Sequence, residues 1–110
     1  MRISFLAPED CPTVPAADME VAAVAAGEWI EQGQGDDGRY LYEYDRRDDQ
    51  AGPGYNIVRH AGVTMSLYQL ARAGHMQFID PADDGLDEML DNLVPAGEGM
   101  AYVENDAQAR

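Results

Sequence analysis

The stretch Gly54-Tyr55-Asn56-Ile57-Val58-Arg59-His60-Ala61-Gly62 decides how the middle of the chain folds. Asn56 suits a helix N-cap, because its side-chain oxygen can accept a hydrogen bond from a free amide of the first turn. We therefore expect a helix from about Asn56 to Ala73. Arg59 and His60 fall in its first turn, where the positive end of the helix dipole disfavours cations. Their position predicts a compensating negative group, either a nearby carboxylate or a bound anion.

Two more helices are predicted, one on each side of this stretch. Residues 16–32 carry methionine, alanine, tryptophan and isoleucine at helical spacing, and the alanines would let a partner helix approach closely. Asp80-Pro81 is a favourable helix start, because an N-cap is followed by a proline in the first turn. The apolar stripe of that helix would be formed by residues 86–93, and Pro95-Ala96-Gly97 would end it.

Two short strands complete the expected secondary structure. Residues 39–45 alternate and place three tyrosines on one face, and residues 100–104 repeat the pattern after a second Gly-rich turn. The predicted fold class is all-α, with antiparallel helix hairpins and two short β-connections. This α-hairpin domain would occupy residues 15–104, after an extended lead-in at residues 1–14 and before a frayed tail at residues 105–110.

The composition is strongly acidic. The 110 residues carry a net charge of −14, with 21 acidic residues against 7 basic ones, all of which are arginine. Such a surface repels nucleic acid and anionic membranes, so neither is expected as a partner. The absence of lysine is typical of a GC-rich genome, and the strong acidity would suit a halophilic source. Cys11 is the single cysteine and permits no intrachain disulfide, and no apolar run approaches the ~20 residues of a membrane helix; both observations favour a cytoplasmic protein.

Three runs of the sequence carry a resemblance to a known group of folds. They are Trp29-Ile30-Glu31-Gln32, Asp37-Gly38-Arg39-Tyr40-Leu41-Tyr42-Glu43-Tyr44-Asp45 and Tyr55-Asn56-Ile57-Val58-Arg59-His60-Ala61-Gly62. Together they resemble (α/α)6-toroid proteins, which include acylglucosamine 2-epimerase-like, six-hairpin glycosidase-like and terpene-cyclase-like groups. The resemblance implies a carbohydrate-related role with a site at the mouth of the ring. A complete toroid has many more helices than the three predicted here, so it also implies a segment, a short relative or a subunit completed by partners.

Arg59 and His60 are the first candidates for chemistry, and two interpretations stay open. In the first, Arg59 presents its planar donor fork to a carboxylate or phosphate, and His60 donates or carries a proton near neutral pH. In the second, Arg59 pairs with Glu43 or Asp45 and pins the strand across the helix end. His60 is then a satisfied, half-buried polar residue without a catalytic role.

The aromatic strand supplies the remaining candidates. Its tyrosines are either a stacking platform for a sugar or the edge of the core; they are Tyr40, Tyr42 and Tyr44. Glu43 and Asp45 share a strand face and would form a general acid and base pair if the site is catalytic. The chain has two histidines, and its acids lack calcium-loop spacing, so no metal and no other cofactor is expected.

Two functions from different classes follow. The first is a carbohydrate-related protein or segment that binds an anionic sugar at Tyr42, Tyr44, Asn56 and Arg59, with His60 and Glu43 as the catalytic residues of any reaction. The second is a non-catalytic interaction module of helical hairpins. It would self-associate or complete a larger subunit, because an isolated repeat leaves its apolar flanks uncovered.

Overall fold

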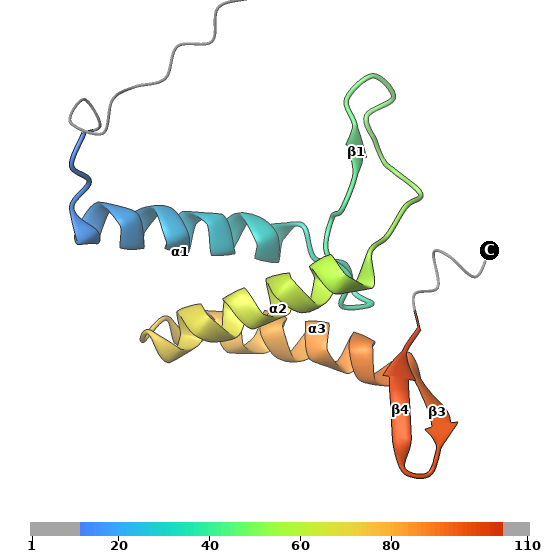
Figure 1. Cartoon of the computed structure of the whole chain (residues 1–110). Coiled ribbons are helices and arrows are strands. Elements are labelled where there is room, and N and C mark those ends of the chain that lie inside the picture. The colour runs from blue at the N-terminus through green and yellow to red at the C-terminus, as the bar shows by residue number, and fades with distance from the viewer. Residues whose placement is uncertain (1–11, 105–110) are drawn as a thin grey trace, which may run out of the picture.

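The computed structural model describes residues 12–104, and this part contains three α-helices and two β-hairpins (Figure 1). Most of the predicted lead-in and the whole tail lie outside the described residues, as does Cys11. The elements in chain order are α1 (Ala16–Gln32), β1 (Tyr44–Asp45), β2 (Gln50–Ala51), α2 (Ile57–Arg72), the 3-10 helix η2 (Met76–Phe78), α3 (Ile79–Asp91), β3 (Leu93–Gly97) and β4 (Met100–Val103).

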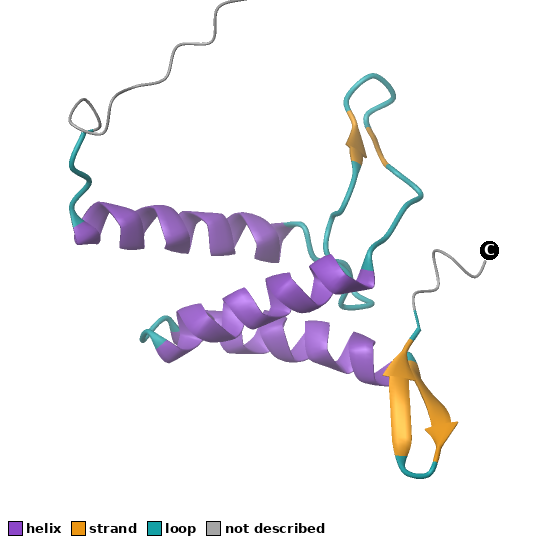
Figure 2. Cartoon of the chain, in the orientation of Figure 1, coloured by secondary structure: helices purple, strands orange, loops and turns teal. Residues whose placement is uncertain are grey.

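The predicted all-α fold class is wrong, because each strand finds a partner and the fold is mixed α/β (Figure 2). β1 pairs antiparallel with β2, which lies outside both of the strands predicted at residues 39–45 and 100–104. β3 pairs antiparallel with β4, and Pro95 therefore belongs to a strand rather than to a helix stop. Gly97 and Gly99 have positive φ values of 86° and 75°, so they allow the tight turn between these two strands.

The core lies between α2, α3 and η2, and the second helix forms as predicted. Asn56 caps α2, since its Oδ1 accepts a hydrogen bond from the Arg59 backbone amide at 3.0 Å. Leu67 and Phe78 are completely buried and form the centre of the core, and Ala82 of α3 packs against them. The face of α2 that packs on this core carries the buried side chains of Thr64, Leu67 and Ala71.

α3 differs from its predicted form at its start and in the face that it buries. The chain turns helical at Met76 and α3 begins at Ile79, because burial of Phe78 draws the segment before Asp80 into the core. The helix then packs through small residues, Pro81, Ala82 and Gly85, so that it approaches α2 closely. The leucines that the sequence pattern placed in the core are instead partly exposed, Leu86 at 38% and Leu90 at 51%.

α1 begins and ends where the sequence predicts but is barely buried. Gly27 is its only buried residue, and a Cβ at that position would come within 2.9 Å of the Leu70 and Phe78 side chains. α1 therefore approaches the α2–η2 region closely at this one point, with partly buried Val24 and Ile30 on either side. His75 adds a polar contact, because its Nε2 lies 2.8 Å from the Glu20 carboxylate.

The two hairpins project from the helices rather than covering them (Figure 2). β1–β2 rises from the connection between α1 and α2, and β3–β4 extends beyond the end of α3 (Figure 1). Across residues 12–104, no helix combines the length and the apolar composition needed to cross a bilayer.

Candidate functional site

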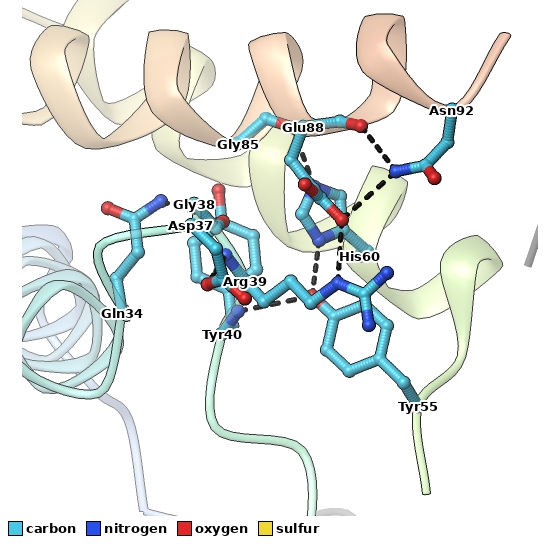
Figure 3. A network of polar contacts seen from close by, with 10 residues as sticks. All are labelled: Gln34, Asp37, Gly38, Arg39, Tyr40, Tyr55, His60, Gly85, Glu88 and Asn92. Atoms are coloured by element: carbon cyan, nitrogen blue, oxygen red, sulfur yellow. Dashed lines mark hydrogen bonds and ion pairs between the residues drawn. The ribbon is translucent and has the colours of Figure 1, made fainter. Parts of the chain in front are cut away.

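A polar network ties the connection after α1 to α3 (Figure 3). The Gln34 amide donates to the carbonyl oxygens of Gly38 and Pro81 at 3.1 and 2.9 Å. Arg39 Nε donates to Glu88 Oε1 at 2.6 Å, and the Glu88 side chain is only 12% exposed. Asn92 donates to the same carboxylate oxygen at 3.0 Å. These bonds hold residues 34–40 on α3, so this segment has no sheet partner and the strand predicted over residues 39–45 shrinks to β1.

His60 lies at the centre of this network and is 2% exposed. Its Nε2 lies 2.6 Å from the Gly85 carbonyl oxygen. Because a carbonyl can only accept, Nε2 carries the proton, and in the neutral ring Nδ1 accepts from the Tyr55 hydroxyl. The Tyr55 oxygen in turn accepts from the Tyr40 backbone amide at 3.1 Å. Both ring nitrogens are thus bonded inside the protein, which is the arrangement expected of a structural histidine.

Burial affects the two tyrosines that surround His60. Loss of solvent raises the pKa of Tyr40, although its hydrogen bond with Thr64 at 2.9 Å partly opposes the rise. Burial likewise raises the pKa of Tyr55 to about 12. Both phenols therefore stay protonated through the physiological range and hold the network together as neutral groups.

Arg59 lies on the exposed side of α2, next to Tyr42 and Asn56. Its Nη1 donates to the Tyr42 hydroxyl at 3.0 Å, and its guanidinium lies 5.3 Å from the centre of that ring. The expected pairing with Glu43 or Asp45 is absent, and Arg59 forms no ion pair with any residue between 12 and 104. The aromatic face of Tyr42 takes the place of the predicted carboxylate.

The structure separates the predicted site into two groups. Tyr42, Asn56, Arg59 and His60 gather at the start of α2, around a cavity of about 50 Å³. Glu43 lies over Gly52 and Gly54, and the Tyr44 hydroxyl donates to Asp49 within the β1–β2 hairpin. Small-molecule sites measure roughly 300–1,000 Å³, so the cavity beside Arg59 has room for water and not for a sugar ring. Saccharide binding, and catalysis by His60 or Glu43, stay predictions.

A larger hollow follows α1. This α1 groove has a volume of about 500 Å³ and is lined by Ala17, Glu20, Val21, Val24, Ala25, Glu28 and His75. Val21 and Ala25 also belong to a ridge with i, i+4 spacing that ends at Trp29; we call these three residues the outer stripe. Val21 is 70% exposed and Trp29 is 63% exposed. An apolar hollow beside an exposed tryptophan is a surface suited to another protein chain.

Comparison with known proteins does not assign this chain to a family. No family model, curated protein or solved structure matches the chain. The resemblance to (α/α)6 toroids therefore stays a prediction. In the part of the chain that the structure describes, no three histidine, cysteine, aspartate or glutamate side chains gather as metal ligands would.

Sequence reasoning missed most members of the network. Arg39 and Glu88 are 49 positions apart, and nothing local to either residue indicates the pair. Gly85 offered the one available signal, because a glycine inside a helical pattern often marks a close packing contact. A Cβ there would overlap the Tyr40 hydroxyl and lie 2.7 Å from Thr64 Oγ1.

Proposed function

We propose that this chain is a non-catalytic interaction module that binds another protein chain through the outer stripe of α1. The observation that carries the proposal is the contrast between the composition of α1 and its burial. α1 is apolar around most of its circumference, yet Gly27 is its only buried residue. A helix that is apolar all round is normally buried on every side. The outer stripe is therefore an apolar surface that no other part of residues 12–104 buries.

The exposed side chains are of the kind that dominate binding energy. Trp29 combines a large apolar surface with a hydrogen-bonding edge, and tryptophan is enriched among residues that contribute most to interfaces. Complete burial of a side chain such as Val21 is worth roughly 1.5–3 kcal/mol. The leucines of α3 are a weaker candidate surface, because Leu86 and Leu90 are 38% and 51% exposed, less than the large side chains of the outer stripe.

The proposal is tested by following the fluorescence of Trp29, the single tryptophan of the chain, while candidate binding partners are added. Its emission and the mass in solution are recorded for the whole chain over a wide concentration range. The same readings are taken with a neutral amphipathic helical peptide and with versions whose polar positions carry arginine or glutamate. We expect a saturable blue shift of Trp29 emission with at least one of these peptides or with rising concentration of the chain itself.

A matched pair of substitutions locates the effect. Val21→Ser alters the outer stripe, whereas Val58→Ser alters an equally exposed valine of α2 that is 76% accessible. Binding should weaken with Val21→Ser and stay unchanged with Val58→Ser. Trp29 emission and mass that respond to none of the peptides, nor to the concentration of the chain, would contradict the proposed function.

A further inference from the structure

The charges of α1 indicate which kind of chain would cover it. The ionisable residues of α1 are all acidic; they are Asp18, Glu20, Glu28 and Glu31. Glu31 lies in the last turn of the helix, where the negative end of the dipole disfavours a carboxylate, and Glu28 lies just before that turn. Among residues 12–104, neither carboxylate has an ion-pair partner. A cation supplied from outside would relieve both.

Two of the four carboxylates of α1 lie beside the apolar surface rather than apart from it. Glu20 and Glu28 line the α1 groove together with Val21, Val24 and Ala25. Glu20 already contacts His75 and Asp18 does not line the groove, so Glu28 is the lining carboxylate left for an incoming cation, and Glu31 follows it three residues along α1. The surface thus joins an apolar hollow to a negative edge along one side of a helix of 17 residues, which is about 25 Å long.

We infer that the partner is an amphipathic helix with arginine or lysine along one border of its apolar face. Its apolar side chains, spaced at i, i+3, i+4 and i+7, would fill the groove over Val21 and Ala25, as in other helix-in-groove complexes. Its cations would lie against Glu28 and Glu31. This inference rests on the proposed function, because it names the partner of the same surface.

Charge complementarity favours this partner over a second copy of the chain. A second copy would bring the same acidic helix and another net charge of −14 to the interface. Like charges placed opposite each other across an interface oppose association and act against the wrong partner. A basic helix meets both the apolar and the acidic part of the surface.

The test uses the whole chain and three peptides of about 18 residues, matched in length to α1. The peptides share their leucine and alanine positions and differ only in carrying arginine, glutamine or glutamate at the polar positions. We expect the arginine peptide to bind about three- to tenfold more tightly than the glutamine peptide at low salt. The difference should shrink as salt is raised, because exposed charge pairs are screened.

Two double variants decide whether the attraction belongs to α1. Glu28→Gln with Glu31→Gln should remove most of the arginine preference. Asp87→Asn with Asp91→Asn makes the same change of net charge near the end of α3 and should preserve it. Equal losses in both variants would overturn the inference, since the attraction would then be a property of the overall charge.

The remaining outcomes separate the inference from the proposed function. Equal binding of the arginine and glutamine peptides would contradict the inference of a basic partner but would still support the proposed interaction module. Dimers in which Trp29 is shielded would have the same meaning, because the partner of the outer stripe would then be a second copy of the chain. A monomer that binds none of the peptides contradicts both proposals.

Discussion

α2 and α1 are helices of similar length with opposite surroundings. α2 packs on α3 and η2, and its inward side chains Thr64, Leu67 and Ala71 are buried. α1 is richer in apolar residues, but Gly27 is its only buried residue. Apolar content therefore does not determine burial in this molecule; a matching neighbour does. α2 has such a neighbour within the chain, and we propose that α1 finds one in another protein.

Truncation of a large side chain in each helix gives the strongest test of this contrast. Leu67→Ala removes a completely buried side chain and should lower the free energy of unfolding by about 2–5 kcal/mol. Trp29→Ala removes a larger side chain that is 63% exposed, so the isolated chain should change by no more than about 0.5 kcal/mol. Urea unfolding followed by circular dichroism measures both. A large loss for Trp29→Ala would show that α1 is already covered.

Glycine substitutions test how tightly α2 and α3 pack. Gly85→Ala would drive a methyl group into the Tyr40 hydroxyl and Thr64, and should cost about 1–3 kcal/mol. Gly62→Ala on α2 has open space around the new methyl group and should be neutral or stabilising by up to about 1 kcal/mol. Thermal unfolding of the two variants measures the difference. Equal melting temperatures would contradict the close approach at Gly85.

Alkaline pH should weaken the packed region specifically. The pKa of Tyr55 is about 12 in the folded chain and about 10 when unfolded, so ionisation above pH 10 favours the unfolded state. The stabilisation is fully present below pH 10 and is lost as the pH rises toward 12. Partial exposure keeps the slope below about 1.4 kcal/mol per pH unit. Urea midpoints should fall over this range, and less steeply in Tyr55→Phe; identical slopes would exclude Tyr55 as the cause.

Arg59→Ala should have the smallest effect on stability. The residue is exposed, and its guanidinium bonds to the Tyr42 hydroxyl and lies over the Tyr42 ring, so the change should stay within about 0.5 kcal/mol. The same variant tests the predicted saccharide site. A thermal shift of the parent chain by uronates, amino sugars or sugar phosphates that disappears in Arg59→Ala would establish that site. With the 50 Å³ cavity beside Arg59, we expect no shift that depends on this residue.

Local signals in the sequence were enough to place α1 and α2. Pro15 precedes the first helix and Gly33 ends it, and Asn56 caps the second through a bond to a residue three positions away. Both hairpins are local, but β2 has two residues and β3 contains a proline and a glycine, so neither shows the pattern of a strand; both were missed and the predicted fold class was wrong. The face of α3 was misjudged for a related reason: its large leucines form the clearer stripe, but its small residues allow the close approach to α2.

The candidate site was predictable only in part. The first-turn position of Arg59 and His60 predicted a compensating negative group, whereas the contacts found in the structure are with neutral groups. Tyr55 and Gly85 form hydrogen bonds with the two ring nitrogens of His60, and the guanidinium of Arg59 lies over the Tyr42 ring. The exposed stripe of α1 was not predictable, because residues 16–32 show helical spacing whether or not the rest of the chain covers them.

Hydrogen exchange measured by mass spectrometry tests the central claim most directly. The amides of α1 and α2 are compared in the whole chain, at a concentration where light scattering gives a monomer, with and without the arginine peptide. We predict that α1 exchanges faster than α2 in the free chain and gains protection with the peptide, while α2 stays unchanged. If the α1 amides are as strongly protected as those of α2 in the free monomer, and the peptide does not change their protection, the claim that α1 binds another chain is contradicted.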